Sequence, residues 1–203
     1  EVDILTRRIK DPDWPEFSEP VTHYDSERER LRIVRIPCGG DSFLAKEALW
    51  PHLREWVTGI MRFYDNRLPD FFTSHYADGG YAGVVLKQES SSGFTFTGHS
   101  LGAQKLDKLD MNPANSKSLD ARFHFSRRIA AERLSMREAS RIITSTGQER
   151  MEQYAHPLYT SAVESGDDER FAVIPPGVNT RIFGAEPGPV DEAVTAFDSS
   201  FAL

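Results

Sequence analysis

FTFTGHSLGAQK, residues 94–105, places a strand pattern directly before a helix pattern. The alternation of phenylalanine and threonine in its first four residues is typical of a strand. Gly98 then allows the chain to turn sharply, and a helix is expected over residues 101–109. A strand followed at once by a helix is the repeating unit of proteins in which parallel strands alternate with helices.

The turn inside this stretch has the residue types of an anion site. Ser100 is placed to cap the helix, whose first N–H groups could receive a negatively charged group. Lys105 follows about one helical turn later and could reach a phosphate as a point charge. An ordinary capped helix with a solvated lysine explains the same two residues, so the turn alone leaves both interpretations open.

The rest of the chain repeats the alternation of strands and helices. The expected strands are residues 2–8, 30–36, 71–74, 94–97, 142–145 and 171–175, and the expected helices are 46–64, 79–87, 101–109, 120–140 and 146–154. This order predicts an α/β fold, a Rossmann-like parallel sheet with helices on both faces. Such sheets bind ligands outside the carboxyl ends of their strands.

The composition limits the kinds of protein that the chain can be. It has 203 residues and a formal net charge of -7, which fits one domain and argues against a binder of nucleic-acid backbones. The single cysteine, Cys38, excludes a disulfide framework and a cysteine-rich zinc site. No apolar run approaches the roughly 18 residues of a membrane span. Because no signal segment opens the chain either, we expect a soluble, cytoplasmic protein.

Unusual side chains lie after the expected strands and on the helices. His75 and His99 each follow a strand pattern, where a histidine can bind a sugar hydroxyl, act as a general base or simply pack. Lys46 at a helix start suits a nearby anion or plain solvation. Arg128 could reach an anionic ligand, or pair on the surface with Glu132 four residues later.

Several familiar catalytic patterns are absent from the sequence. It has no G-x-x-x-x-G-K-[ST] phosphate loop, no G-x-G-x-x-G fingerprint and no G-x-S-x-G nucleophile elbow. No spacing of histidines and carboxylates is typical of a metal site, so no metal ion or other cofactor is expected. Cys38 has no evident activating base, which argues against a cysteine hydrolase.

Six short stretches carry a more specific pattern. They are VDILTRRI (2–9), HYADGG (75–80), TFTGHSLGAQK (95–105), RRIAAER (127–133), TSTGQE (144–149) and VIPPGV (173–178). Together, and in this order, they resemble the sucrose-phosphate synthase and sucrose synthase group of retaining glycosyltransferases. The resemblance covers residues 2–183, and several motifs in one order are more specific than any one of them.

The resemblance implies a GT-B fold, in which two Rossmann-like domains face each other across a cleft. In this group the N-terminal domain binds the acceptor, fructose 6-phosphate, and the C-terminal domain binds the nucleotide sugar, typically UDP-glucose. The product is sucrose 6-phosphate, formed with retention at the anomeric carbon. Residues 1–179 then correspond to an acceptor domain without its first strand, and residues 180–203 to the interdomain linker and the start of a missing C-terminal domain. Alone, the fragment is expected to be inactive.

The same resemblance assigns roles to individual residues. The matched positions are His99, which faces the transferred sugar, Lys46, Lys105 and Arg128, which bind the acceptor phosphate, and Tyr76 and Ser100, which line the acceptor site. With Arg127, the three cations are expected to form a basic pocket in an otherwise acidic surface. Loop geometry alone accounts for His75 and Asp78.

Three other functions are compatible with these residues. A related glycosyltransferase with another donor, such as GDP-mannose, would use the same acceptor domain. Sucrose synthase is less expected if Lys46, Lys105 and Arg128 converge, since free fructose needs no cationic pocket. A protein of a different class, a non-catalytic module that binds sugar phosphates, would need no donor domain.

Overall fold

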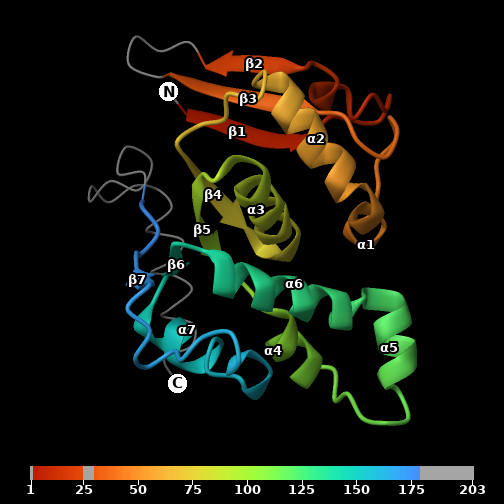
Figure 1. Ribbon diagram of the computed structural model, residues 1–203. Helices are drawn as coiled ribbons and strands as arrows, with labels where there is room; N and C mark the ends of the chain where they lie inside the picture. The colour runs from red at the N-terminus through yellow and green to blue at the C-terminus, as the bar shows by residue number, and fades with distance from the viewer. Residues whose placement is uncertain (1, 25–29, 179–203) are drawn as a thin grey trace, which may run out of the picture.

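The computed structural model describes residues 2–24 and 30–178, where strands and helices alternate (Figure 1). The strands are β1 (Val2–Arg7), β2 (Val21–Tyr24), β3 (Leu31–Ile36), β4 (Phe71–His75), β5 (Gly93–Thr97), β6 (Arg141–Thr144) and β7 (Phe171–Val173). The α-helices are α1 (Lys46–Leu49), α2 (Leu53–Phe63), α3 (Tyr76–Ser90), α4 (Gly102–Asp107), α5 (Ser116–Phe123), α6 (Phe125–Glu138) and α7 (Gly147–Glu152). Short 3-10 helices are η1 (Pro15–Phe17), η2 (Trp50–His52) and η3 (Pro157–Tyr159). The segment expected to be a linker, residues 180–203, lies outside the described residues.

The strands form two hydrogen-bonded groups. The four-stranded sheet has the order β4-β5-β6-β7 and is parallel throughout, which confirms the predicted α/β class. The other sheet has the order β1-β3-β2, with β1 parallel and β2 antiparallel to β3. Strand β2 was not predicted, because its four residues, VTHY, offer too short a pattern to separate from a loop. None of the described helices has the length and hydrophobicity that a membrane span requires.

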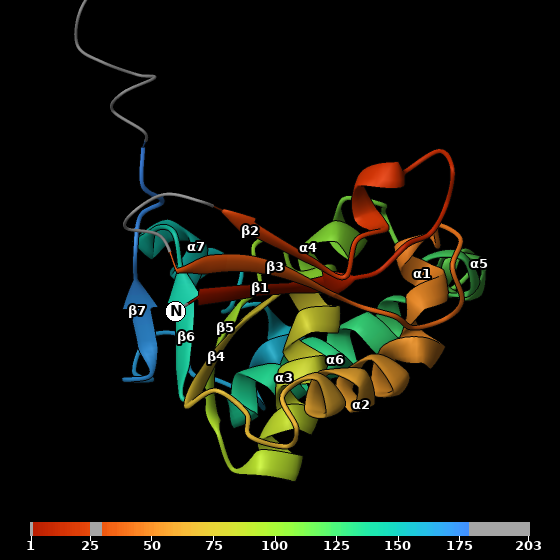
Figure 2. The same ribbon diagram turned by 90° about the horizontal axis from the view of Figure 1, so that it is seen from above.

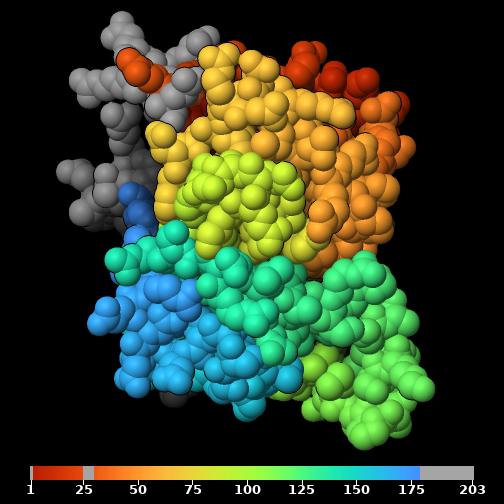
Figure 3. Space-filling model, in the orientation of Figure 1, coloured from red at the N-terminus to blue at the C-terminus, as the bar shows by residue number. Residues whose placement is uncertain are grey.

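Helix α3 lies in the middle of the molecule and packs against both β4 and β5. It is flanked by α2 and α6, and the space-filling view shows the three side by side on one face (Figure 3). Gly80 allows this close approach, since a Cβ atom there would lie 2.7 Å from the ring of Phe96. The predicted glycine-rich turn at the start of this helix is therefore wrong. The helix begins earlier, at Tyr76, and two of its glycines, Gly80 and Gly83, are packing positions.

Two predicted helices are broken in the structure. The helix expected over residues 46–64 is divided into α1, η2 and α2 around Pro51, which has no N–H to continue the hydrogen-bond ladder. The helix expected over residues 120–140 is divided at His124, whose φ of 52° is left-handed. The Asp120 carboxylate accepts a hydrogen bond of 2.7 Å from the Ser126 amide and so caps the start of α6.

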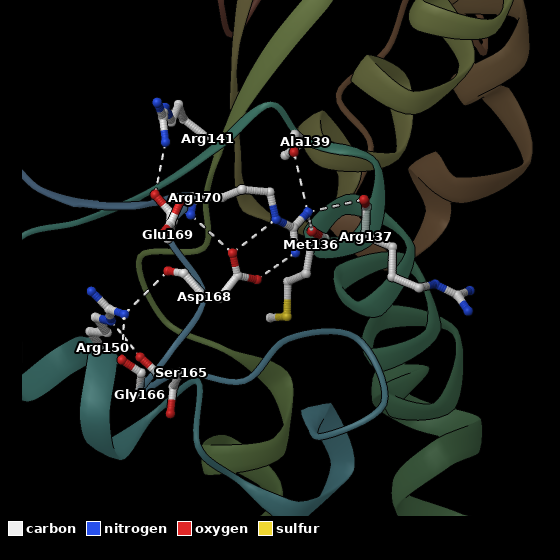
Figure 4. A network of polar contacts seen from close by, with 10 residues as sticks. All are labelled: Met136, Arg137, Ala139, Arg141, Arg150, Ser165, Gly166, Asp168, Glu169 and Arg170. Atoms are coloured by element: carbon white, nitrogen blue, oxygen red, sulfur yellow. Dashed lines mark hydrogen bonds and ion pairs between the residues drawn. The ribbon is translucent and has the colours of Figure 1, made fainter.

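Arg170 ties the end of α6 to the loop before β7 (Figure 4). Its Nη1 donates to the carbonyl oxygens of Met136 and Arg137, at 2.7 and 3.0 Å. The carboxylate of Asp168 accepts from Nε and Nη2 of the same arginine, at 3.0 and 2.6 Å. Because the last carbonyls of a helix have no partner within it, a cation held there stabilises the helix end.

Replacing Asp168 with asparagine is expected to lower the unfolding free energy by about 1.5–3 kcal/mol near neutral pH, as for a lost charge-assisted hydrogen bond. The hydrogen bond from Arg170 lowers the pKa of Asp168 below its ordinary value of 3.8. The contribution of this ion pair to the unfolding free energy is therefore complete above pH 3.8 and is lost as the pH falls below that value. Urea unfolding at about pH 7 and about pH 3 measures this loss.

The exposed neighbour Asp167 provides the matched control, and Asp167→Asn should change stability at neither pH. An Asp168→Asn variant that loses as much stability in acid as at neutral pH would contradict the ion pair.

Candidate functional site

The carboxyl ends of β4 and β5 bring two histidines together. His75 of β4 is paired in register with Thr97 of β5, and His99 follows two residues later. Nδ1 of His75 lies 2.9 Å from Nε2 of His99, and the two rings stack with their centroids 5.1 Å apart. The φ of His99 is 56°, a left-handed conformation that is uncommon without glycine and is concentrated at functional turns.

The contact between His75 and His99 limits the charge that the pair can hold. One ring nitrogen must donate a proton and the other must accept it. Burial, and then the neighbouring His99, lower the pKa of His75, so His75 resists protonation. The ring of Tyr76 lies 4.6 Å from that of His99 and adds an aromatic neighbour.

A pocket of about 560 Å³ lies beside this pair, among α1, α3, α4 and the corner between α5 and α6. Figures 1 and 2 both show α1 and α5 on the same side of the molecule, on the right in each view. The lining residues are Lys46, Glu47, Trp50, Tyr76, Ala77, Asp78, Lys105, Lys108, Leu109, Phe123, Phe125 and Arg128. The structure therefore brings four of the predicted site residues, Lys46, Tyr76, Lys105 and Arg128, to one pocket.

The basic side chains of this pocket repel one another. Burial, and then Arg128 and Lys46, lower the pKa of Lys105. Within the described part of the chain, the Lys105 amine has no hydrogen bond or ion pair. Nζ of the exposed Lys46 lies 3.7 Å from Oε1 of Glu47. Four cations line the pocket against two carboxylates, Glu47 and Asp78, and this excess of positive charge favours an anionic ligand.

Arg128 is held in place from behind. Its Nε donates to Glu132 at 2.9 Å and its Nη2 donates to the carbonyl oxygen of Ser100 at 2.5 Å. The alternative of an ordinary surface ion pair is wrong, because the side chain of Glu132 is only 1% exposed. Two of the three guanidinium nitrogens are thus engaged within the protein, and the arginine also lines the pocket.

Ser100 does not have the capping role that the sequence suggested. The residue before α4 is Leu101, and no side chain caps the helix from that position. The first amides of α4 are already engaged, Gly102 with Glu132 at 3.0 Å and Ala103 with the hydroxyl of Tyr159 at 3.1 Å. The prediction that this helix start is open to an anionic ligand is therefore wrong, since the carboxylate of Glu132 occupies it.

Other residues differ from the sequence prediction in their position. Ser100, Arg127 and His99 are not among the residues that line the pocket, although His99 touches Tyr76, which does line it. Lys108 was missed and does line it. Its spacing of three residues from Lys105, which puts both on neighbouring turns of one helix, was the available signal. Among residues 2–24 and 30–178, no group of three or more His, Cys, Asp or Glu side chains could hold a metal ion.

The family model for the first GT-B domain of sucrose synthase matches residues 4–187. The chain belongs to this family. A probable sucrose-phosphate synthase of Thermosipho melanesiensis is 51% identical over 183 residues, covering 90% of this chain and 42% of that protein. The mannosylfructose-phosphate synthase of Agrobacterium fabrum is 38% identical over 148 residues, covering 71% of this chain and 31% of that protein.

Solved structures share the fold. The sucrose-phosphate synthase of Thermosynechococcus elongatus superposes with a TM-score of 0.69 at 21% identity, over 96% of this chain and 42% of that one. The chain thus spans 42% of the length of the Thermosipho relative and of this solved chain.

Proposed function

We propose that the chain is the acceptor-binding part of a sucrose-phosphate synthase, which transfers glucose from UDP-glucose to fructose 6-phosphate with retention at the anomeric carbon. The observation that carries this proposal is the convergence of Lys46, Lys105, Lys108 and Arg128 on one pocket beside His99. A phosphate monoester would balance the positive charge that remains after the pairs of Lys46 with Glu47 and of Arg128 with Glu132. The 51% identity to a probable sucrose-phosphate synthase supports the same assignment.

In this proposal the pocket holds the acceptor by its phosphate. Lys105 and Arg128 bind the phosphate, while Tyr76 and the apolar side chains beside it contact the sugar. Fixing the acceptor in this way places its hydroxyl against the anomeric carbon of the donor, and such positioning lowers a reaction barrier by several kcal/mol. No side chain of this chain is assigned as a nucleophile, because the departing diphosphate assists attack on the same face of the sugar.

His99 lies at the edge of the pocket, where it would face the transferred sugar. Its contact with His75 uses Nε2, so Nδ1 is the ring nitrogen of His99 that remains available. The groups that stabilise the departing diphosphate belong, in this proposal, to a second domain of the full-length protein. The remaining residues, 180–203, are assigned to the linker and to the start of that domain. The cytoplasmic location expected from the sequence remains a prediction.

A second candidate differs only in the donor, in both its nucleotide and its sugar. A relative with 38% identity is a mannosylfructose-phosphate synthase, so a GDP-mannose donor is the alternative to UDP-glucose. The pocket of this chain suits the phosphorylated acceptor in both cases. A non-catalytic module that binds sugar phosphates would use the same pocket without a donor.

A donor panel assayed with the full-length protein separates these functions. UDP-glucose and GDP-mannose are each incubated with fructose 6-phosphate or with free fructose, and the nucleotide released is measured. We expect release from UDP-glucose with fructose 6-phosphate, and much less with fructose. Release from GDP-mannose with fructose 6-phosphate, and none from UDP-glucose, would favour the second candidate. Fructose 6-phosphate binding without turnover of any donor would favour the non-catalytic module.

A further inference from the structure

The side chain of Glu132 is a buried carboxylate behind the pocket and does not line it. It accepts hydrogen bonds from the Gly102 amide at 3.0 Å and from Nε of Arg128 at 2.9 Å. The hydroxyl of Tyr159 also donates to it. Burial raises the pKa of Glu132, and these donors oppose that effect by stabilising the charged form.

Tyr159 connects this carboxylate to the start of α4. Its side chain comes from η3 and is fully buried. While its hydroxyl donates to Glu132, the same oxygen accepts from the Ala103 amide at 3.1 Å. The position of Glu132 is therefore fixed by a residue that lies 27 positions later in the chain.

A second buried tyrosine holds the other end of the same turn. The hydroxyl of Tyr154 accepts from the Gly98 amide at 3.0 Å, and no hydrogen bond joins it to Glu132 or Arg128 in the described part of the chain. The turn from Gly98 to Ala103, which carries His99 in its left-handed conformation, is thus held by two tyrosines of the same burial. A left-handed residue persists where its surroundings over-determine it.

We propose that Glu132 and Tyr159 are positioning residues, which aim Arg128 into the pocket and thereby set its affinity for a phosphorylated ligand. This inference rests on the proposed function only in naming that ligand as a sugar phosphate. A well-packed apolar pair is often as stable as a buried ion pair, so stability alone does not explain the carboxylate. The carboxylate accepts from Nε of Arg128, while the carbonyl oxygen of Ser100 accepts from Nη2 of the same guanidinium.

The two tyrosines allow a matched test in the full-length protein, with Tyr159→Phe and Tyr154→Phe. Tyr159→Phe should weaken fructose 6-phosphate binding by about tenfold, the usual effect of losing a hydrogen bond to a charged group. It should change fructose binding much less, because free fructose has no phosphate for Arg128. Tyr154→Phe releases only the amide of Gly98, so it should lower kcat and leave the affinity for fructose 6-phosphate unchanged.

Calorimetric titration with fructose 6-phosphate, fructose and inorganic phosphate provides the readout, with thermal melting as the check on folding. Glu132→Gln is the second variant and should weaken the binding of both fructose 6-phosphate and inorganic phosphate. If Tyr159→Phe is folded and binds inorganic phosphate as the wild type does, the positioning role is overturned. If the wild type binds phosphate but not fructose 6-phosphate, the proposed acceptor is contradicted and the positioning role is not. Weaker phosphate binding by the variants then still supports the positioning role. A wild type that binds neither ligand overturns both proposals.

Discussion

Replacing Lys105 with alanine in the full-length protein is expected to weaken fructose 6-phosphate binding by about 100-fold, within the range for truncating one member of a desolvated charge pair. The lysine is half-buried in the wall of the pocket, and no carboxylate among the described residues pairs with its amine. Its charge is therefore available to the ligand. Binding of the nucleotide sugar should not change, because we assign that ligand to another domain.

Titration calorimetry with each ligand separately measures this difference. Lys117 of α5 is an exposed lysine that does not line the pocket, so Lys117→Ala is the matched control and should bind both ligands normally. Lys105→Arg keeps the positive charge and should recover part of the lost affinity. Equal losses for the acceptor and the donor would argue against a specific role for Lys105 and in favour of a general disturbance of the fold.

The strand and helix around Lys105 were predictable because their signals are local. FTFT alternates over four residues, and the glycine that follows permits the turn, so β5 and α4 lie close to their expected positions. The parallel register of β4 and β5 then follows from the fold class, and it places His75 near His99. The convergence of Lys46 and Arg128 on one pocket was expected from family resemblance, and its geometry came only with the structure.

The boundaries of the helices were less predictable, because single residues decide them. Pro51 interrupts the helix that begins at Lys46, since it lies too far from that start to be tolerated as a first-turn proline. His124 ends α5 in a left-handed conformation that no sequence pattern indicates for histidine. In each case the apolar periodicity continues across the break and conceals it.

The burial of Glu132 could not be predicted from the sequence. A spacing of four residues from Arg128 on a helix is typical of exposed ion pairs, and the local pattern is the same in both situations. The carboxylate accepts from the buried Tyr159, a residue far along the chain, whose hydroxyl also accepts from the amide of Ala103 in α4. Long-range packing of this kind has no signature in a single sequence.

Replacing His99 with alanine in the full-length protein is expected to lower kcat by about 100- to 1,000-fold, the usual effect of losing one hydrogen-bonding group that acts on the transition state. In our proposal this side chain faces the transferred sugar and not the acceptor phosphate. The KM for fructose 6-phosphate should therefore change little. His23, an exposed histidine on β2, is the matched control, and His23→Ala should leave kcat unchanged.

His75→Ala tests how His99 is held. Without the 2.9 Å contact the ring of His99 loses its fixed proton arrangement, so kcat should fall, although by less than in His99→Ala. Steady-state kinetics of the two single variants and the double variant measure the coupling. If the histidines act as one unit, the double variant will be no slower than His99→Ala, because the partner has nothing left to orient. If the loss of kcat in the double variant is the product of the two single losses, the two rings have independent roles. If His99→Ala raises the KM for fructose 6-phosphate at normal kcat, His99 acts in acceptor binding and not in sugar transfer.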